Sequence, residues 1–164
     1  MDLVATLVTV PFDHPDAVKL NDLVQAEYVE RYGDGDVTPL DPAMFAPPRG
    51  LYLLAYDGRG RPVATGGWRA QSATGEGYAD GDAELKRMFV VREARGQGLA
   101  RRILARLEET AREAGRTRMV LETGTMQPEA IALYESSGYL PVPADGKFGL
   151  YRHTASSRCY TKPL

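Results

Sequence analysis

The sequence predicts a single α/β domain in which helices cover both faces of a mixed β-sheet. At 164 residues, the chain has the length of about one domain. Patterns with apolar residues at every second position, typical of strands, alternate with patterns of helical period. Along the chain they give the order β-α-β-β-β-α-β-α-β-β. The single cysteine, Cys159, excludes an internal disulfide framework and a cysteine zinc cluster.

The N-terminal third begins with a strand and a helix. Alternating β-branched residues over residues 3–10 predict the strand. Pro15 suits the first turn of the helix that follows, and Gly33 is typical of a helix end. Residues 33–50 are rich in Gly, Pro and Asp, which predicts a long loop with a short helix near residues 42–45.

Three strands follow in succession. An Asp-Gly-Arg-Gly turn at residues 57–60 joins a strand at 51–56 to a strand at 62–69. Small polar residues predict a loop over residues 71–82. The third of these strands covers residues 84–91.

The second half contains the strongest amphipathic helix pattern, which Gly115 ends. Its apolar residues recur at every fourth position and share one face: Leu99, Ile103, Leu107 and Ala111. The elements expected after it are a strand at 117–122, a helix from Pro128 to Gly138, a strand at 139–142, a loop at 143–157 and a strand at 158–161.

Charge is distributed unevenly over a chain whose net charge is only −2. Residues 1–57 carry ten acidic and three basic side chains, whereas residues 86–118 carry ten basic side chains and four glutamates. A basic segment in an acidic protein indicates a compact anion, such as a nucleotide phosphate, more than a long nucleic acid. A nucleic-acid-binding protein is the weaker alternative, and it would bind DNA with a steep salt dependence.

Several classes of protein are not expected. Two histidines, His14 and His153, leave little for a histidine metal site, so we expect no metal. No apolar run approaches the roughly 18 residues of a membrane span, so we expect no membrane partner. The N-terminus lacks the basic region of a signal peptide, which favours a cytoplasmic location.

The most informative segment is Val90–Arg102, where a strand enters a glycine-bearing turn that opens a helix. Glycine lets the backbone approach a ligand closely, and the free N–H groups of a helix start bind phosphate. Arg101 and Arg102 oppose the helix dipole in that first turn, which fits a polyanion bound there. The segment has neither a dinucleotide fingerprint nor the Gly-Lys-Ser/Thr of a P-loop.

Two motifs carry a family resemblance. Residues 95–100 read Arg-Gly-Gln-Gly-Leu-Ala, and residues 127–139 read Gln-Pro-Glu-Ala-Ile-Ala-Leu-Tyr-Glu-Ser-Ser-Gly-Tyr. In this order, separated by a strand, they resemble the acetyl-CoA motif and the second signature of the GCN5-related N-acetyltransferases. The likeness is close over residues 84–142 and rests on element order over residues 3–83.

The resemblance implies one N-acetyltransferase domain over residues 1–164. Within it, residues 3–83 would form the acceptor side, 84–142 the acetyl-CoA core, and 143–164 a C-terminal loop and strand. The strands at 84–91 and 117–122 would splay apart to admit the pantetheine arm. The implied cofactor contacts are Met88, Phe89, Val90, Arg95, Gly96, Gln97, Gly98, Leu99, Ala100, Arg101, Gln127 and Tyr134. Gln127 stands where the family usually has asparagine.

Two side chains are candidates for proton transfer. The resemblance places Tyr134 near the cofactor sulfur as a general acid, and core packing is the alternative. It also makes Glu84 a candidate base, because it lies six residues before Val90. Strand alternation would put Glu84, Lys86, Met88 and Val90 on one face. Alternatively, Glu84 forms an ion pair with Lys86 or Arg69. In that case the base is a water molecule or Glu122.

The acceptor is expected to be the primary amine of a small molecule, attacked directly in a ternary complex. Trp68, Arg69 and Glu122 are the candidate substrate contacts, although Trp68 equally fits a core residue. The acidic first third favours a cationic acceptor. A protein N-terminus or lysine as acceptor, or a CoA-binding regulatory module without turnover, are the other functions considered. A homodimer that pairs the final strand or hairpin is possible by analogy with the family.

Overall fold

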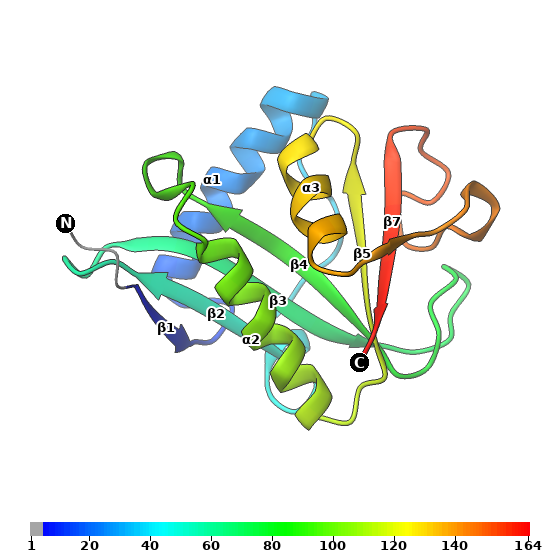
Figure 1. Cartoon of the computed structure of the whole chain (residues 1–164), viewed down its shortest axis with the longest axis horizontal. Coiled ribbons are helices and arrows are strands. Elements are labelled where there is room, and N and C mark those ends of the chain that lie inside the picture. The colour runs from blue at the N-terminus through cyan, green and yellow to red at the C-terminus, as the bar shows by residue number, and fades with distance from the viewer. Residues whose placement is uncertain (1–4) are drawn as a thin grey trace.

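The computed structural model describes residues 5–164 and contains one seven-stranded sheet in the order β1-β2-β3-β4-β5-β7-β6 (Figure 1). The strands are β1 Thr6–Thr9, β2 Gly50–Tyr56, β3 Pro62–Gln71, β4 Asp82–Val90, β5 Arg118–Gly124, β6 Leu140–Pro141 and β7 Ser157–Pro163. The helices are α1 Pro15–Tyr32, α2 Leu99–Glu113 and α3 Pro128–Ser136, with short 3-10 turns at Pro42–Phe45, Arg92–Ala94 and Ala144–Gly146. The predicted fold class and element order are confirmed.

Helices cover both faces of the sheet because their apolar stripes need separate partners. Ile103 and Leu107 of α2 are fully buried in the larger core, which also contains Tyr134 of α3. Ala17 and Leu20 of α1 pack in a second core on the opposite face of the sheet, with Tyr52 among their neighbours. Figure 1 accordingly shows α2 and α3 in front of the sheet and α1 behind it.

Strand β4 contains a bulge that changes which residues share a face. Its register with β3 shifts between Thr65 and Gly67, and Arg87 has a φ of 60°. Such an extra residue breaks the strict alternation of side chains. Lys86 and Arg87 both face the α1 side, whereas Met88 packs against the core beneath α2. The expectation that residues 84, 86, 88 and 90 share one face is therefore wrong.

The parallel strands β4 and β5 separate soon after they start. They pair only where Asp82–Glu84 lie beside Arg118–Val120. Beyond that point β3 continues to pair with β4, and β7 continues to pair with β5. Figure 1 shows the two strands diverging from their common lower end. The sheet is therefore open at one edge of β4, where the β5-facing backbone of residues 85–90 has no strand partner.

The C-terminal strand lies inside the sheet. β7 pairs with β5 along its whole length and with β6 at Thr161 and Tyr160. A homodimer that pairs the final strand would have to form beside β6, which covers β7 only at these two residues, and the homodimer stays a prediction. Residues 3 and 4 of the first predicted strand lie outside the described residues, and the loop predicted at 71–82 is shorter because Gln71 pairs with Asp82. Among residues 5–164, no helix has the length and apolar character that crossing a membrane requires.

Candidate active site

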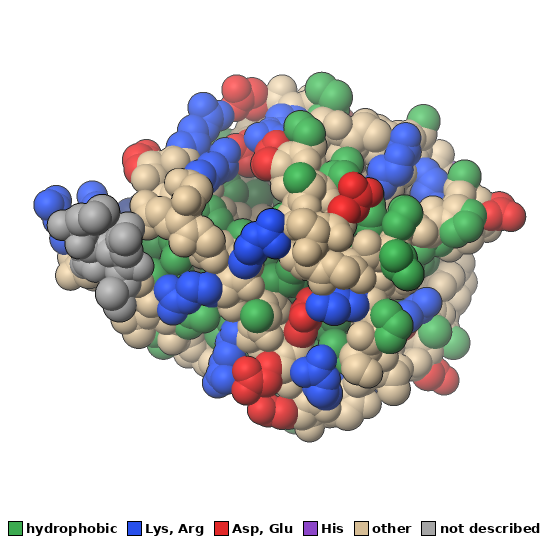
Figure 2. Space-filling view, in the orientation of Figure 1, with side chains coloured by type: hydrophobic (Ala, Val, Ile, Leu, Met, Phe, Trp, Pro, Cys, Tyr) green, Lys and Arg blue, Asp and Glu red, His purple; other side chains and the backbone are tan. Residues whose placement is uncertain are grey.

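A cavity of about 600 Å³ occupies the opening between β4 and β5. It is lined from one side of the sheet by the start of α2 and by α3, and from the other by α1, residues 34–36 and residues from the C-terminal loop. Figure 2 shows the surface hollowed between α3 and the turn before α2, with basic side chains at the rim. The cavity thus connects the two faces of the sheet through the splayed strands.

The α2 end of the cavity has free backbone donors. Gly96 and Gly98 have φ values of 81° and 77°, and a Cβ atom added at either would meet nothing within 4 Å. Among residues 5–164, no side chain caps the helix, and its first intrahelical bond runs from the Arg102 N–H to the Gly98 carbonyl. The preceding N–H groups therefore remain available to an anion. This turn fits the diphosphate of coenzyme A, as the sequence motif predicts.

Arginines hold the turn in place. Arg95 donates from Nε to the Val90 carbonyl at 2.8 Å and from Nη2 to Glu27 Oε1 at 3.0 Å, and it lies over the Phe89 ring. Arg101 donates to the hydroxyls of residues 136 and 137 at the end of α3. All predicted cofactor contacts line the cavity except Gln97.

Tyr134 lies on the α3 side of the opening. Its side chain is 6% exposed, lines the cavity and packs edge-on against Tyr139. Among residues 5–164, no group forms a hydrogen bond with its hydroxyl, and burial alone raises the pKa of the phenol. A buried polar group without a partner inside a cavity is a candidate to meet a ligand there.

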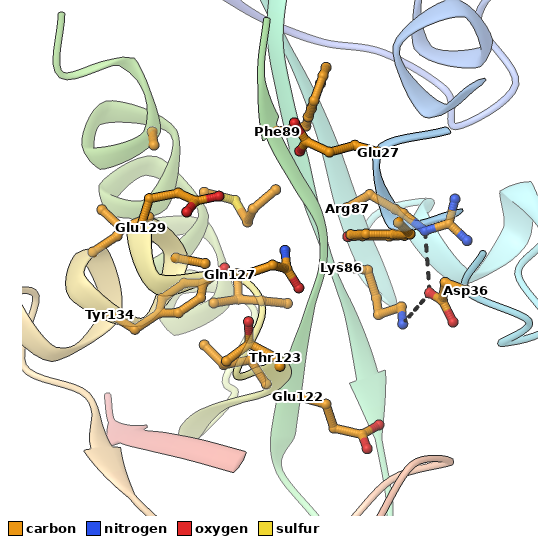
Figure 3. Close-up of a pocket in the computed structure, with 18 of the residues that line it drawn as sticks. Glu27, Asp36, Lys86, Arg87, Phe89, Glu122, Thr123, Gln127, Glu129 and Tyr134 are labelled. Carbon is orange, nitrogen blue, oxygen red and sulfur yellow. Dashed lines mark hydrogen bonds and ion pairs between the residues drawn. The ribbon is translucent and has the colours of Figure 1, made fainter. Parts of the chain in front are cut away.

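Glu122 lies on the other side of the opening. It shares the sheet face of Val120, which packs in a separate small core under the C-terminal loop. The pKa of Glu122 is raised to about 7, above all by burial and also by the nearby carboxylates Glu84 and Asp36. The hydrogen bond from the Tyr151 N–H and the charge of Lys86 oppose this rise. In Figure 3, Glu122 extends to one side of β4 and Tyr134 lies on the other. The two groups therefore flank the opening from opposite faces.

Glu84 does not line the cavity. It is 1% exposed and accepts hydrogen bonds from Arg69, Gln71 and Tyr78 at 2.8 to 2.9 Å. Its carboxylate oxygens are thus engaged in the core, so this position does not fit the predicted base. The ion pair with Arg69, one of the alternatives, is present.

The predicted substrate contacts on β3 are also elsewhere. Trp68 is 1% exposed and donates to the Thr110 hydroxyl of α2, which makes it a core residue. Arg69 donates hydrogen bonds to the Glu84 carboxylate and to the Pro39 carbonyl. Its side chain is not part of the cavity lining. Of the three candidates, only Glu122 lines the cavity.

Substituting Glu84 by glutamine tests its structural position. We expect the free energy of unfolding to fall by about 3 kcal/mol, because Arg69 would keep its charge without its buried partner. Urea denaturation measures this change. The pH dependence of turnover should keep its acidic limb, moved to somewhat lower pH because the Glu84 charge no longer raises the pKa of Glu122. A lost acidic limb in this variant would return the base role to Glu84.

Sequence patterns missed most of the residues on the α1 side. Tyr28 of α1 lines the cavity. Asp36 sits in the predicted loop and accepts from Lys86 and from the Tyr151 hydroxyl. Tyr151 comes from the C-terminal loop, more than a hundred residues away in the chain. The acidic, glycine-rich composition of residues 33–50 was the one sequence signal for the loop that contains Asp36.

A sheet opened between two parallel strands, with an uncapped helix start at the mouth, is the arrangement expected of an acyltransferase that uses an acyl-CoA donor. The chain matches the Acetyltransferase (GNAT) family over residues 17–139 and belongs to this family, whose members are acetyl-CoA-dependent acyltransferases. The resemblance stated from the two motifs is confirmed.

Individual relatives agree with this assignment. The chain is 46% identical over 85 residues to the IAA acetyltransferase of Azospirillum brasilense, and the match spans 51% of this chain and about half, 53%, of that protein. It is 32% identical to the uncharacterized N-acetyltransferase YjgM of Escherichia coli over 77% of this chain and 76% of YjgM. A crystal structure of a proposed acyl-CoA N-acyltransferase from Klebsiella pneumoniae superposes with a TM-score of 0.77 at 27% identity, covering 99% of both chains.

Proposed function

We propose that the protein transfers the acetyl group of acetyl-CoA to the primary amine of a small molecule, by direct attack in a ternary complex. The observation that carries this proposal is the single cavity that runs through the opening between β4 and β5. Bound acetyl-CoA supplies the activated acetyl group. The donor lies on the α2 and α3 side, with its phosphates on Gly96–Arg101, and the acceptor lies on the α1 side.

Glu122 is the proposed general base. An alkylammonium has a pKa near 10, so the amine must lose a proton before it can attack. A carboxylate with a pKa of about 7 accepts a proton more readily than an ordinary glutamate and remains largely ionised at slightly alkaline pH. Its place on the acceptor face supports this role over that of Glu84.

Tyr134 is the proposed general acid. Its unpartnered hydroxyl lies on the donor face, where the sulfur of the thioester would reach the opening. A protonated phenol in that position can donate to the departing thiolate. The raised pKa keeps the phenol protonated at neutral pH.

A small acceptor is supported by the loops over the α1 side. The Tyr151 hydroxyl donates to Asp36 and accepts from the Val37 N–H, each at 2.8 Å. Gln25 bonds both the N–H and the carbonyl of Asp36. These contacts join residues 34–38 to the C-terminal loop above the cavity, which leaves little room for a protein chain.

Release of free coenzyme A in the presence of a panel of amines tests the proposed function. We expect turnover with at least one small primary amine. Turnover with peptides or proteins alone would support the alternative of a protein acetyltransferase. Binding of acetyl-CoA without turnover of any amine would support a regulatory module.

Substituting Tyr134 by phenylalanine keeps the ring and removes only the hydroxyl. We expect kcat to fall about 10- to 100-fold, because the thiolate then leaves without a proton donor. Binding of acetyl-CoA should change much less, and the free energy of unfolding should change by less than about 1 kcal/mol, since no hydrogen bond to the hydroxyl is lost. Initial rates and urea denaturation measure these quantities.

The matched control is Tyr160→Phe. Tyr160 also has a buried ring, but its hydroxyl donates to Glu135 and lies outside the cavity. This variant should retain the wild-type kcat. A Tyr134→Phe protein that works at the wild-type rate would show that Tyr134 only packs.

A further inference from the structure

Two cations stand side by side on the acceptor face because of the β4 bulge. Lys86 and Arg87 follow each other in sequence, yet both reach toward Asp36 on the α1 side and line the cavity (Figure 3). Arg87 is held there with a φ of 60°, a conformation that costs a residue other than glycine free energy. Strain of this kind in a cavity wall points to a role for the side chain.

Asp36 does not satisfy both cations. Its Oδ2 accepts from Lys86 at 2.9 Å but lies 3.4 Å from the Arg87 Nε, which has no hydrogen-bond partner. Its Oδ1 is already engaged by Thr38 and by the Tyr151 hydroxyl. Arg87 donates from Nη1 to Asn21, and within residues 5–164 its Nη2 meets no acceptor. The cluster therefore carries one positive charge in excess and spare guanidinium donors, at a position where Arg87 is 8% exposed.

The other charges around the cavity do not cancel this excess. Glu27 is paired with Arg31 and Arg95. Asp34 is exposed at the rim, where water screens its charge. Glu122, the remaining carboxylate on this face, is the proposed base and lies on the same side of β4 as the cluster in Figure 3. The acceptor face therefore has a positive end and a carboxylate end.

From this arrangement we infer that the acceptor is an amine that also bears a carboxylate, such as an α-amino acid. The carboxylate binds Arg87 and Lys86 through charge-assisted hydrogen bonds, while the ammonium group faces Glu122. The inference rests on the proposed function and replaces the cationic acceptor that the acidic N-terminal third suggested, because Asp36 of that region is engaged by the protein's own cations.

A panel of α-amino acids and their primary amides tests the inference in the wild-type protein, with coenzyme A release as the readout. Each pair differs only in the carboxylate. We expect kcat/KM to be about tenfold or more higher for the acid of the best pair, the scale of a charge-assisted hydrogen bond. The basicity of the amines alone would favour the amide, because its amino group is less basic and a larger fraction of it is unprotonated. A preference for the acid therefore cannot come from the protonation state of the free amine.

Variants identify the residues responsible. Arg87→Met should bring the ratio of kcat/KM for acid and amide close to one, and Lys86→Met should lower it as a second, independent variant. Arg92→Met is the matched control, because Arg92 is exposed, pairs with Glu30 and lies outside the cavity, so the ratio should stay at its wild-type value.

Each outcome separates the two proposals. Equal turnover of acids and amides by the wild-type protein, or an unchanged ratio in both cavity variants, overturns the carboxylate site and leaves the amine acetyltransferase standing. If no primary amine of any kind is acetylated, the proposed function fails and the inference fails with it.

Discussion

Glu122→Gln lowers kcat by about 10²-fold or more at neutral pH, because the bound amine then has no carboxylate to take its proton. The wild-type rate should fall as the pH drops below about 7, since protonation of Glu122 removes the base. That acidic limb should be absent from the variant. A full pH profile of kcat/KM for both proteins measures the difference.

The fold should tolerate this change. Burial raises the pKa of Glu122 from 4.5 to about 7 in the folded protein, so this group lowers the free energy of unfolding as the pH rises from about 4.5 to 7, and the full loss remains above pH 7. Glutamine resembles the neutral form and can still accept from the Tyr151 N–H. The variant should therefore be at least as stable as the wild type at pH 8 in urea denaturation. The matched control is Glu84→Gln, which should lose stability and keep its acidic limb. A wild-type profile in Glu122→Gln would assign proton removal to water.

Gly98→Asp weakens the binding of coenzyme A by roughly 100-fold or more. The new carboxylate would stand where the diphosphate approaches the α2 N-terminus, and like charges about 4 Å apart near a surface repel by a few kcal/mol. Aspartate would also cap the free N–H groups that the phosphates need. Calorimetric titration with coenzyme A and with a pantetheine analogue lacking the diphosphate separates the two parts of the ligand, because only coenzyme A should lose affinity.

Gly115→Asp is the matched control for backbone strain. Gly115 has a φ of 82°, and an added Cβ there meets nothing within 4 Å, as at Gly98. Because the two φ values are similar, both variants bear a similar free-energy cost for placing aspartate at a positive φ. Gly115 follows the opposite end of α2, so this control leaves the helix N-terminus unchanged. Unchanged affinity in a folded Gly98→Asp protein would place the phosphates elsewhere.

The donor half of the site could be predicted from the sequence because it is local. The glycine turn, the helix that follows it and the Tyr134 helix are each encoded in short segments, and Gly96, Gly98 and Tyr134 all line the cavity. The family resemblance that these segments carry implied that they meet at one opening of the sheet.

The acceptor half is assembled from distant segments, and local patterns could not reveal it. Tyr151 and Asp36 meet across the fold. The bulge at Arg87 has no sequence signature, since a residue other than glycine holds the positive φ. Spacing made Glu84 the leading base, but spacing cannot show that three donors from other segments enclose its carboxylate. Glu122, the weaker alternative, owes its raised pKa to tertiary burial.

The passage through the sheet also bears on the order of events in a catalytic cycle. In the proposed reaction, the donor would enter beside α3, where Figure 2 shows the surface hollowed, and the acceptor would bind at the other end of the cavity, beneath the loops on the α1 side. Bound at opposite ends of one cavity, the two substrates would not compete for the same space, so donor binding would not by itself exclude the acceptor. After transfer, coenzyme A would leave through the hollow beside α3, and its release would not require the acetylated product to leave first.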